Sequence, residues 1–206
     1  MKISYALLTH NETDSLLKLI EFLVKHKDEE DEIVILDDYS DDEKTKEILD
    51  TMCSIYEIKF DQRHLLKDFA GQKNYLKNMC SGDYIVNLDA DEIPHKQLLF
   101  NLKTILESNP TIDLYYVPRV NTVDGLTQEH INYWKWNVNE KGWINFPDWQ
   151  GRIWRNRPNI RWERPVHEML VGFKEYTYLP EQEEFSFYHP KDIKRQEKQN
   201  NFYREI

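Results

Sequence analysis

A cluster of acidic side chains follows one apolar run near the middle of the chain. The run "YIVNL" (residues 84–88) leads directly into Asp89, Asp91 and Glu92. An unpaired carboxylate near a core is costly, so such clusters usually hold a cation or belong to a site. Two carboxylates spaced two residues apart can divide the work, because one can reach a ribose hydroxyl while the other holds a divalent cation against phosphate oxygens. A strand that runs out into a solvated acidic turn would explain an isolated cluster equally well.

The elements around this cluster alternate between short apolar runs and amphipathic segments. Apolar runs predict strands at residues 4–8, 32–36, 56–60, 84–88 and 114–120, and helical spacing predicts helices at 13–27, 42–53, 70–82 and 96–108. We expect Thr13 or Asp14 to cap the first helix and Gly82 to end the third. Strands that are apolar almost throughout and alternate with helices indicate an α/β fold, with a mainly parallel sheet flanked by helices.

Polar residues follow three of these predicted strands. His10 and Asn11 follow the first, Asp37 and Asp38 follow the second, and the acidic cluster follows the fourth. Ligands of such sheets bind outside the carboxyl ends of the strands. Because these polar groups are predicted to share that edge, the acidic cluster is better explained as part of a site than as a solvated turn.

The texture of the sequence changes after residue 120. Residues 121–165 hold all six tryptophans, with arginines interleaved: Trp134, Trp136, Trp143, Trp149, Trp154 and Trp162, and Arg152, Arg155, Arg157, Arg161 and Arg164. A packed β-rich region with solvated arginines is one interpretation. The other is a ligand-binding region, since indole faces stack on sugar rings and arginines hold phosphates. The final residues, 189–206, form a polar, helix-prone tail.

Composition excludes several classes of protein. The net charge of −10 disfavours a nucleic-acid-binding surface, and 40% apolar residues suffice for a sizeable core. Cys53 and Cys80 show no metal-ligand spacing and suggest reduced thiols. The N-terminus does not resemble a signal peptide, and no apolar run is long enough to span a membrane. We therefore expect a soluble, cytoplasmic protein.

The first half of the chain carries a recognisable order of motifs. "YALLTHNE", "IVILDDYSDD" and "GQKNYLKNMCSGDYIVNLDADE" together resemble the nucleotide-sugar-binding half of inverting family 2 glycosyltransferases, which have the Rossmann-like GT-A fold. The resemblance implies that Asp38 pairs with the base of the nucleotide, that Asp89 contacts the ribose and that Asp91 ligates Mn²⁺ or Mg²⁺. It also implies that the nucleotide-sugar site includes Thr9, Asn11 and Lys73.

The second half is similar to a subgroup of the same family through "WQGRIWRNRPNIRWERPVHEML" and "FYHPKD". This resemblance implies that Glu168 is the general base and that His189 completes the metal shell. Glu163 and Asp148 stay open as alternative bases. A purely structural role for His167 and His189 also stays open, and the proline after His189 is expected to end the strand-like "EFSFY".

The expected molecule is a single GT-A domain over residues 1–206. Residues 1–95 would bind the nucleotide sugar, and the Trp/Arg-rich residues 96–206 would form the acceptor side. The expected reaction is metal-dependent transfer of a sugar from a nucleotide diphosphate sugar to a hydroxyl of a glycan, lipid-linked or protein acceptor, with inversion. A carboxylate at Asp38 favours a uridine donor, although guanine also presents N–H groups. The polar end "NNFYREI" is compatible with a further domain beyond it.

Two alternatives from other functional classes remain. A metal-dependent nucleotidyl or phosphoryl transferase would also place acids at strand ends, but the chain has no GxGxxG or GxxxxGK[ST] run to hold phosphates. A non-catalytic carbohydrate-binding domain would explain the tryptophans but leaves the ordered acids of the first half without a purpose.

Overall fold

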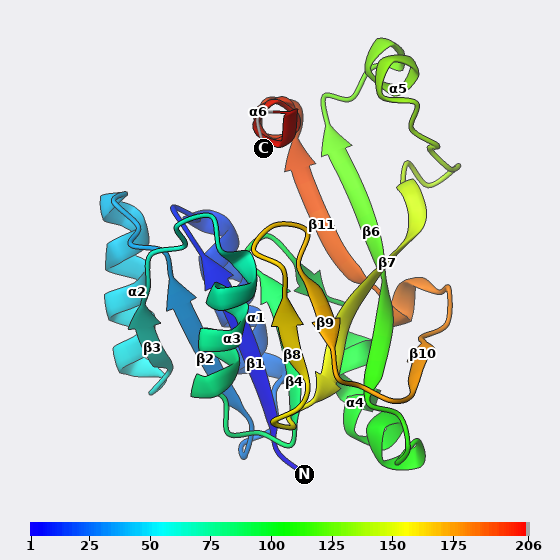
Figure 1. Cartoon of the computed structure of the whole chain (residues 1–206). Coiled ribbons are helices and arrows are strands. Elements are labelled where there is room, and N and C mark those ends of the chain that lie inside the picture. Colours follow the sequence, from blue (N-terminus) through cyan, green and yellow to red (C-terminus); the bar gives the residue numbers. More distant parts are fainter. Residues whose placement is uncertain (205–206) are drawn as a thin grey trace.

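A twisted central sheet carries helices on both faces in the computed structural model of the chain (Figure 1). The structure describes residues 1–204, and for residue 199 and residues 201–204 it describes the backbone alone. The first half contains β1 (Ile3–Thr9), α1 (Asp14–His26), β2 (Glu32–Asp37), α2 (Glu43–Ile55), β3 (Lys59–Gln62), α3 (Phe69–Met79) and β4 (Tyr84–Asp89). β1 pairs in parallel with both β2 and β4, and β2 pairs in parallel with β3, so the carboxyl ends of these strands share one edge.

The second half extends the same sheet. It contains β5 (Ile93–Pro94), α4 (Lys96–Ser108), β6 (Leu114–Asp124), α5 (Gln128–Trp134), β7 (Ile144–Arg155), β8 (Arg161–Glu163), β9 (Met169–Val171), β10 (Tyr176–Tyr178), the 3₁₀ helix η1 (Glu183–Phe185), β11 (Phe187–Asp192) and α6 (Ile193–Arg204). The strand order is β3-β2-β1-β4-β7-β6-β11-β5, with β10 also beside β6. β7 lies antiparallel between β4 and β6, whereas β6 pairs in parallel with β10 and β11. The sheet is therefore mixed but mainly parallel, which confirms the expected α/β fold.

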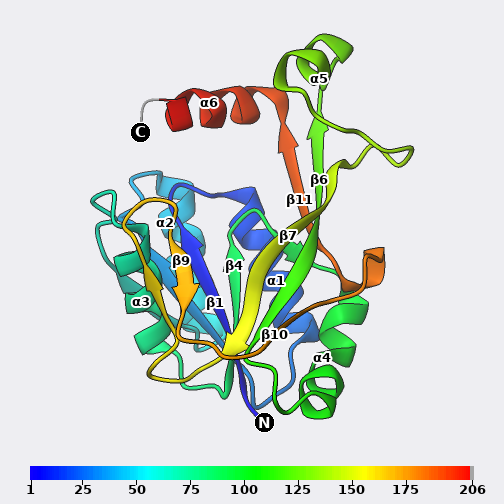
Figure 2. The same ribbon diagram turned by 45° about the vertical axis from the view of Figure 1, so that its right-hand side comes forward.

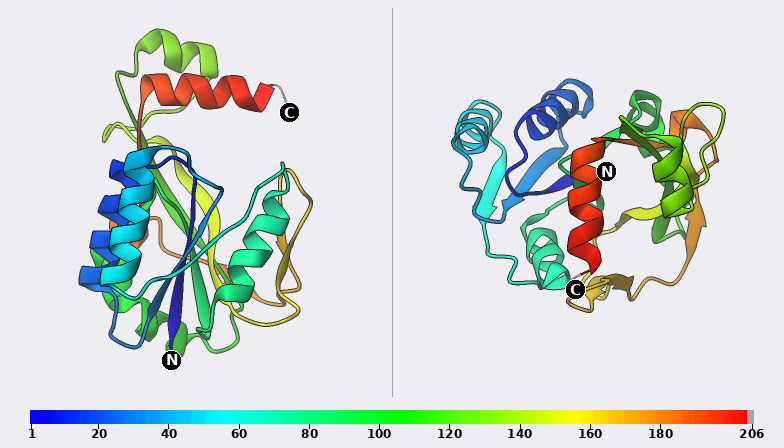
Figure 3. Two further views of the ribbon diagram at one scale, coloured as in Figure 1. Left: turned by 90° about the vertical axis from the view of Figure 1, so that its left-hand side faces the viewer. Right: turned by 90° about the horizontal axis from the view of Figure 1, so that it is seen from above.

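Apolar side chains fill the space on both faces of the sheet. α1, α2 and α4 cover one face, where Leu19 and Leu102 are buried. α3 and the β8–β9 hairpin cover the other, as Figure 3 shows in its left view. There Trp154 and Trp162 are buried with ring centroids 5.5 Å apart. Two of the six tryptophans are therefore core residues, and each large side chain so buried stabilises the fold by roughly 1.5–3 kcal/mol.

Several element boundaries differ from the sequence expectation. The third strand begins at Lys59, because the backbone turns at Glu57 (φ 51°) after α2. α3 ends at Met79 with Cys80 as its cap, so Gly82 is not the helix end. Gly82 is instead required where two segments meet, since a Cβ there would lie 2.6 Å from the backbone nitrogen of Ser4. The expected strand end at Pro190 is also wrong, because β11 pairs with β6 through that residue.

The strands β6 and β11 carry α5 and α6 beyond the carboxyl edge of the sheet (Figures 1 and 2). Seen from above, α6 extends across the molecule toward the β8–β9 hairpin (Figure 3, right). Nε2 of His130 on α5 lies 3.7 Å from Oε1 of Glu197 on α6, which links the two helices. Among the described residues, no helix combines the length and apolarity needed to cross a bilayer.

Candidate active site

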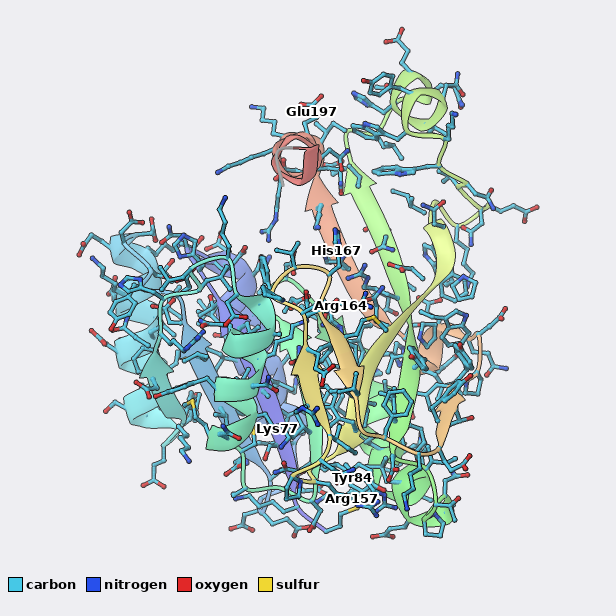
Figure 4. The ribbon with its side chains drawn as sticks, in the orientation of Figure 1. Lys77, Tyr84, Arg157, Arg164, His167 and Glu197 are labelled. Atoms are coloured by element: carbon cyan, nitrogen blue, oxygen red, sulfur yellow. The ribbon has the colours of Figure 1, made fainter. Side chains whose placement is uncertain are left out.

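A cleft of about 670 Å³ opens at the carboxyl edge of the sheet. Its lining brings together most of the residues that the sequence singled out: Thr9, Asp38, Lys73, Asp89, Asp91, Glu168 and His189. Figure 4 shows His167, at the turn between β8 and β9, below Glu197 of α6. The cleft thus lies where the ends of β1, β2 and β4 face elements of the second half of the chain.

Asp89 ends β4 and is held by an arginine. Nη2 of Arg152, on β7, donates to Oδ2 of Asp89 at 2.5 Å. Burial raises the pKa of the Asp89 carboxyl, but the charges of Arg152, Lys73 and Arg119 outweigh burial and hold that pKa below its usual range. Asp89 is therefore a fixed carboxylate that can accept hydrogen bonds from a ligand.

Glu92 has a different role from its two acidic neighbours. Its side chain is 0% exposed, and its Oε1 accepts from Arg152 at 2.6 Å and from Arg119 at 2.9 Å. A buried carboxylate with two guanidinium partners is an internal anchor. The expectation that Arg152 is either solvated or available for phosphate is wrong, since its side chain is 6% exposed and is shared between Asp89 and Glu92.

Asp91 is in direct contact with His189 in the wall of the cleft. Nε2 of His189 lies 3.2 Å from Oδ2 of Asp91, and Nδ1 of His189 lies 2.7 Å from Oδ1 of Asn121. Nη2 of Arg195, on α6, donates to the same Asp91 oxygen at 2.9 Å and also pairs with Glu12. Burial raises the pKa of Asp91, but the contact with His189 outweighs it and the net shift is downward.

Asp91 and His189 fit part of a metal shell. Among the described residues there is no group of three or more His, Cys, Asp or Glu side chains that could hold a metal ion. Two protein ligands suit a divalent cation whose other positions are filled by phosphate oxygens and water. Asn121 can accept the Nδ1 proton of His189, which would leave Nε2 as the ligand atom. The pair therefore fits a cation bound together with a diphosphate, and not one held by the protein alone.

The two acids that follow β2 have separate roles. Asp37 is 0% exposed and accepts from the backbone N–H and hydroxyl of Ser40 and from Nε2 of Gln62. Asp38 lines the cleft, and its Oδ1 accepts the backbone N–H of Leu65 at 2.8 Å. Of the two acids, Asp38 is thus the one that lines the cleft, and its contact with a nucleotide stays a prediction.

The two residues at the end of β1 also differ. Thr9 lines the cleft, and its buried hydroxyl has no hydrogen-bond partner among the described residues. Asn11 is absent from the lining of this cleft. Its side chain donates to Asp41 and accepts the backbone N–H groups of Asp41 and Asp42, which ties the loop after β1 to the loop after β2. The structure therefore gives Asn11 a role in shaping the loops.

Lys73 and Glu168 meet in the cleft. Nζ of Lys73, on α3, donates to Oε1 of Glu168 at 2.5 Å and lies 4.3 Å from the centre of the Trp162 ring. The Glu168 side chain is half-buried, with 20% exposed. Phe69, the first residue of α3, donates its backbone N–H to the carbonyl of Pro165, which fixes the turn that carries Glu168.

The two alternative bases lie in other settings. Glu163 is exposed, pairs with Arg161 and does not line the cleft. Asp148 accepts two bonds from Arg119 and one each from Asn121 and Gln150. Burial raises the pKa of Asp148, but the charge of Arg119 outweighs burial and lowers it.

Sequence reasoning missed several residues that shape the cleft: Glu92 as a buried anchor, Arg119, Asn121, Gln150 and Arg195. One signal was available for Glu92. Three acids within four residues at a strand end cannot all face a single ligand, because successive side chains point in different directions.

The profile described as "Glycosyl transferase family 2" matches residues 4–174 of the chain. No curated protein sequence matches significantly. Among solved structures, S. aureus TarS superposes with a TM-score of 0.63 at 16% identity, covering 92% of this chain and 37% of that chain. TarS 1–349 gives 0.61 at 15% identity, covering 92% and 60%. The same fragment in complex with UDP-GlcNAc gives 0.52 at 16% identity, covering 90% and 60%. The chain thus spans well under two thirds of each of these structures, and the likeness confirms the GT-A fold.

Proposed function

The chain belongs to glycosyl transferase family 2, and from that premise we propose that it moves a sugar from a UDP-sugar to an acceptor hydroxyl with inversion, with the help of a divalent cation. That it is a glycosyltransferase follows from the family and the fold. The observation that carries the finer proposal is the single cleft in which Asp38, Asp89 and Asp91 face Glu168 and His189. The UDP-GlcNAc bound to TarS 1–349 supports the choice of a uridine donor.

The donor would lie across the ends of β2, β1 and β4. Asp38 accepts a hydrogen bond from an N–H group of the base, and Asp89 accepts one from a ribose hydroxyl. Arg152 keeps Asp89 ionised and fixed, so that carboxylate is ready before the nucleotide arrives. Lys73 adds a positive charge close to Asp89 at the edge of α3.

Asp91 and His189 would hold the cation, either Mn²⁺ or Mg²⁺. When bound, that ion supplies positive charge to the departing diphosphate. The imidazole of His189 favours Mn²⁺, which is the softer of the two ions. Arg195 would remain beside Asp91 and Glu12. Its guanidinium would add a second positive charge, next to that of the cation, at the diphosphate end of the cleft.

The transfer step needs a base on the acceptor side, and Glu168 is the proposed one. Its carboxylate takes the proton of the acceptor hydroxyl as that oxygen forms a bond to the anomeric carbon. The bond from that carbon to the diphosphate oxygen breaks, and the diphosphate leaves with the electron pair. Lys73, on the neighbouring helix α3, orients the Glu168 carboxylate through its direct contact with it.

Nucleotide binding tests the donor assignment. Calorimetric titrations of UDP, GDP and ADP, each with and without Mn²⁺, should rank UDP plus Mn²⁺ tightest. Equal affinity for all three nucleotides would contradict the uridine assignment. A UDP affinity that is the same with and without Mn²⁺ would contradict the proposal that a divalent cation binds together with the diphosphate.

A further inference from the structure

One part of the cleft wall comes from the segments that stand above the sheet. The linker between α5 and β7 contributes Trp136, and α6 contributes Gln196 and Asn200. Among the residues whose side chains are described, these are the only lining residues from those two segments, and none is charged. The donor part of the cleft is different, since it contains Lys73, Asp89, Asp91 and two arginines.

The indole of Trp136 is backed by other rings. Its centroid lies 4.5 Å from that of Trp134, which in turn stacks on His130 at 5.0 Å and 12°. The backbone N–H of Trp136 donates to the carbonyl of Ile131 at 3.1 Å, which fixes the turn after α5. The ring is therefore held in place before any ligand arrives, which limits the entropy lost on binding.

α6 presents a neutral face to the cleft. Gln196 and Asn200 are four residues apart and share one side of the helix, and Nε2 of Gln196 donates to Oδ1 of Asn200 at 2.9 Å. The two charged residues that flank Gln196 are engaged elsewhere, because Arg195 pairs with Glu12 and Asp91 and Glu197 lies beside His130. The amides still offer donors and acceptors beyond the one bond between them.

We propose that Trp136, Gln196 and Asn200 form the acceptor subsite and that the acceptor is a neutral saccharide; this rests on the proposed function. A sugar ring has an apolar C–H face that packs on an indole, and its hydroxyls both donate and accept, as amides do. A lipid phosphate would require cations or a cluster of backbone N–H groups in this part of the wall. A peptide acceptor would require a strand edge or an apolar groove.

The test compares rates of nucleoside diphosphate release from the donor that the enzyme hydrolyses. The probes are methyl glucoside, lactose, cellobiose and chitobiose, with farnesyl phosphate and a Ser/Thr peptide at equal concentration. The quantity measured is the ratio of the rate with a probe to the rate without it. At least one saccharide should raise this ratio in the unmodified protein, and farnesyl phosphate and the peptide should not.

Variants then assign the effect to the subsite. Trp136→Ala and Gln196→Leu should each weaken the apparent saccharide affinity by about tenfold, the loss expected when one ring contact or one amide partner is removed. Trp136→Phe should keep most of the apparent saccharide affinity, because it retains an aromatic ring. Trp143→Ala is the matched control, because that tryptophan belongs to the same segment, packs beside Lys141 and Phe146 and does not line the cleft.

With a donor that is hydrolysed, the inference is overturned if only farnesyl phosphate or the peptide raises the ratio, if no saccharide raises it, or if Trp136→Ala behaves like Trp143→Ala. Titration calorimetry of the same saccharides, on the unmodified protein and on Trp136→Ala, measures the affinity of the subsite without any need for donor turnover. A protein that hydrolyses no donor yet binds a saccharide through Trp136 would contradict the proposed function and support the subsite. Donor hydrolysis without saccharide binding would support the proposed function and contradict the subsite.

Discussion

Nζ of Lys73 lies 2.5 Å from Oε1 of Glu168, so a salt bridge spanning 95 positions of sequence joins the two halves of the chain inside the cleft. Lys73 comes from α3 and Glu168 from the turn before β9, two elements that cover the same face of the sheet. Glu168, the proposed base, is thus held in the cleft that Asp38, Asp89 and Asp91 also line. The proposed transfer needs a base within hydrogen-bond reach of the acceptor hydroxyl.

Glu168→Gln should abolish sugar transfer, because an amide cannot take the acceptor proton. UDP affinity should stay near that of the unmodified protein, since the amide keeps the shape of the side chain. The matched control is Glu163→Gln, which alters an exposed acid outside the cleft and should retain full activity. Near-normal transfer by Glu168→Gln would show that Glu168 is structural. Asp148 would then be the next base to test.

Asp38→Ala should weaken the binding of free UDP by roughly 1–3 kcal/mol, the cost of removing a charged hydrogen-bond partner. Titration calorimetry measures this directly. Asp50→Ala, an exposed acid on α2, serves as the control for a lost negative charge. If Asp38→Ala binds UDP as tightly as the control does, Asp38 does not contact the base. Asp37 is a poor substitute in that case, because it is buried and its oxygens are already used by Ser40 and Gln62.

Asp91→Asn should lose activity by orders of magnitude and should remove the effect of Mn²⁺ on UDP affinity, because the proposed cation keeps only one protein ligand. EDTA should reproduce the loss in the unmodified protein. Asp124→Asn is a control at the exposed end of β6. Full activity of Asp91→Asn, or of the unmodified protein in EDTA, would contradict a catalytic cation at this site.

Arg152→Met should lower the free energy of unfolding by roughly 1.5–3 kcal/mol near neutral pH, because the buried Glu92 carboxylate keeps only Arg119 and the Asp89 carboxylate loses its arginine. Against the upward effect of burial, Arg152 lowers the pKa of Asp89 in the folded state. Asp89 therefore contributes stability above its unfolded pKa of about 3.9, and that contribution is lost as the pH falls further.

The difference in stability between Arg152→Met and the unmodified protein should consequently shrink as the pH falls below about 4, because Asp89 takes up a proton in the unfolded chain at a higher pH than in the folded protein. Urea unfolding at several pH values measures it. Arg161→Met, which removes an exposed arginine paired with Glu163, should change the free energy of unfolding little. A difference that stays constant across this pH range would mean that Arg152 acts through packing alone.

The donor half was predictable because its signals are local. Apolar runs that end in polar residues define β1, β2 and β4, and a parallel sheet brings those ends to one edge. Asp38, Asp89 and Asp91 were therefore predicted to lie at one edge, and all three line the same cleft. Asn11 follows a strand in the same way, but the left-handed backbone at this residue (φ 53°) directs its amide to the neighbouring loop.

The second half was less predictable because its contacts are long-range. Arg152 reaches Asp89 across 63 positions and Glu92 across 60, and its residue type alone gave no means of telling a buried ion pair from a phosphate ligand. The position of α6 over the cleft depends on the unexpected length of β11, which continues through Pro190. Glu168 and His189 were named through the family resemblance, and the structure places both of them in the cleft.

The most direct test of the central claim is the identity of the products formed from nucleotide sugars. The protein is incubated with Mn²⁺ and UDP-glucose, UDP-galactose, UDP-GlcNAc or GDP-mannose, and the nucleotide released is identified by chromatography. The proposed function predicts free UDP from at least one UDP-sugar, in amounts equal to the sugar transferred to acceptor or water. Release of UMP with a sugar phosphate, or binding without turnover of any donor, would contradict it.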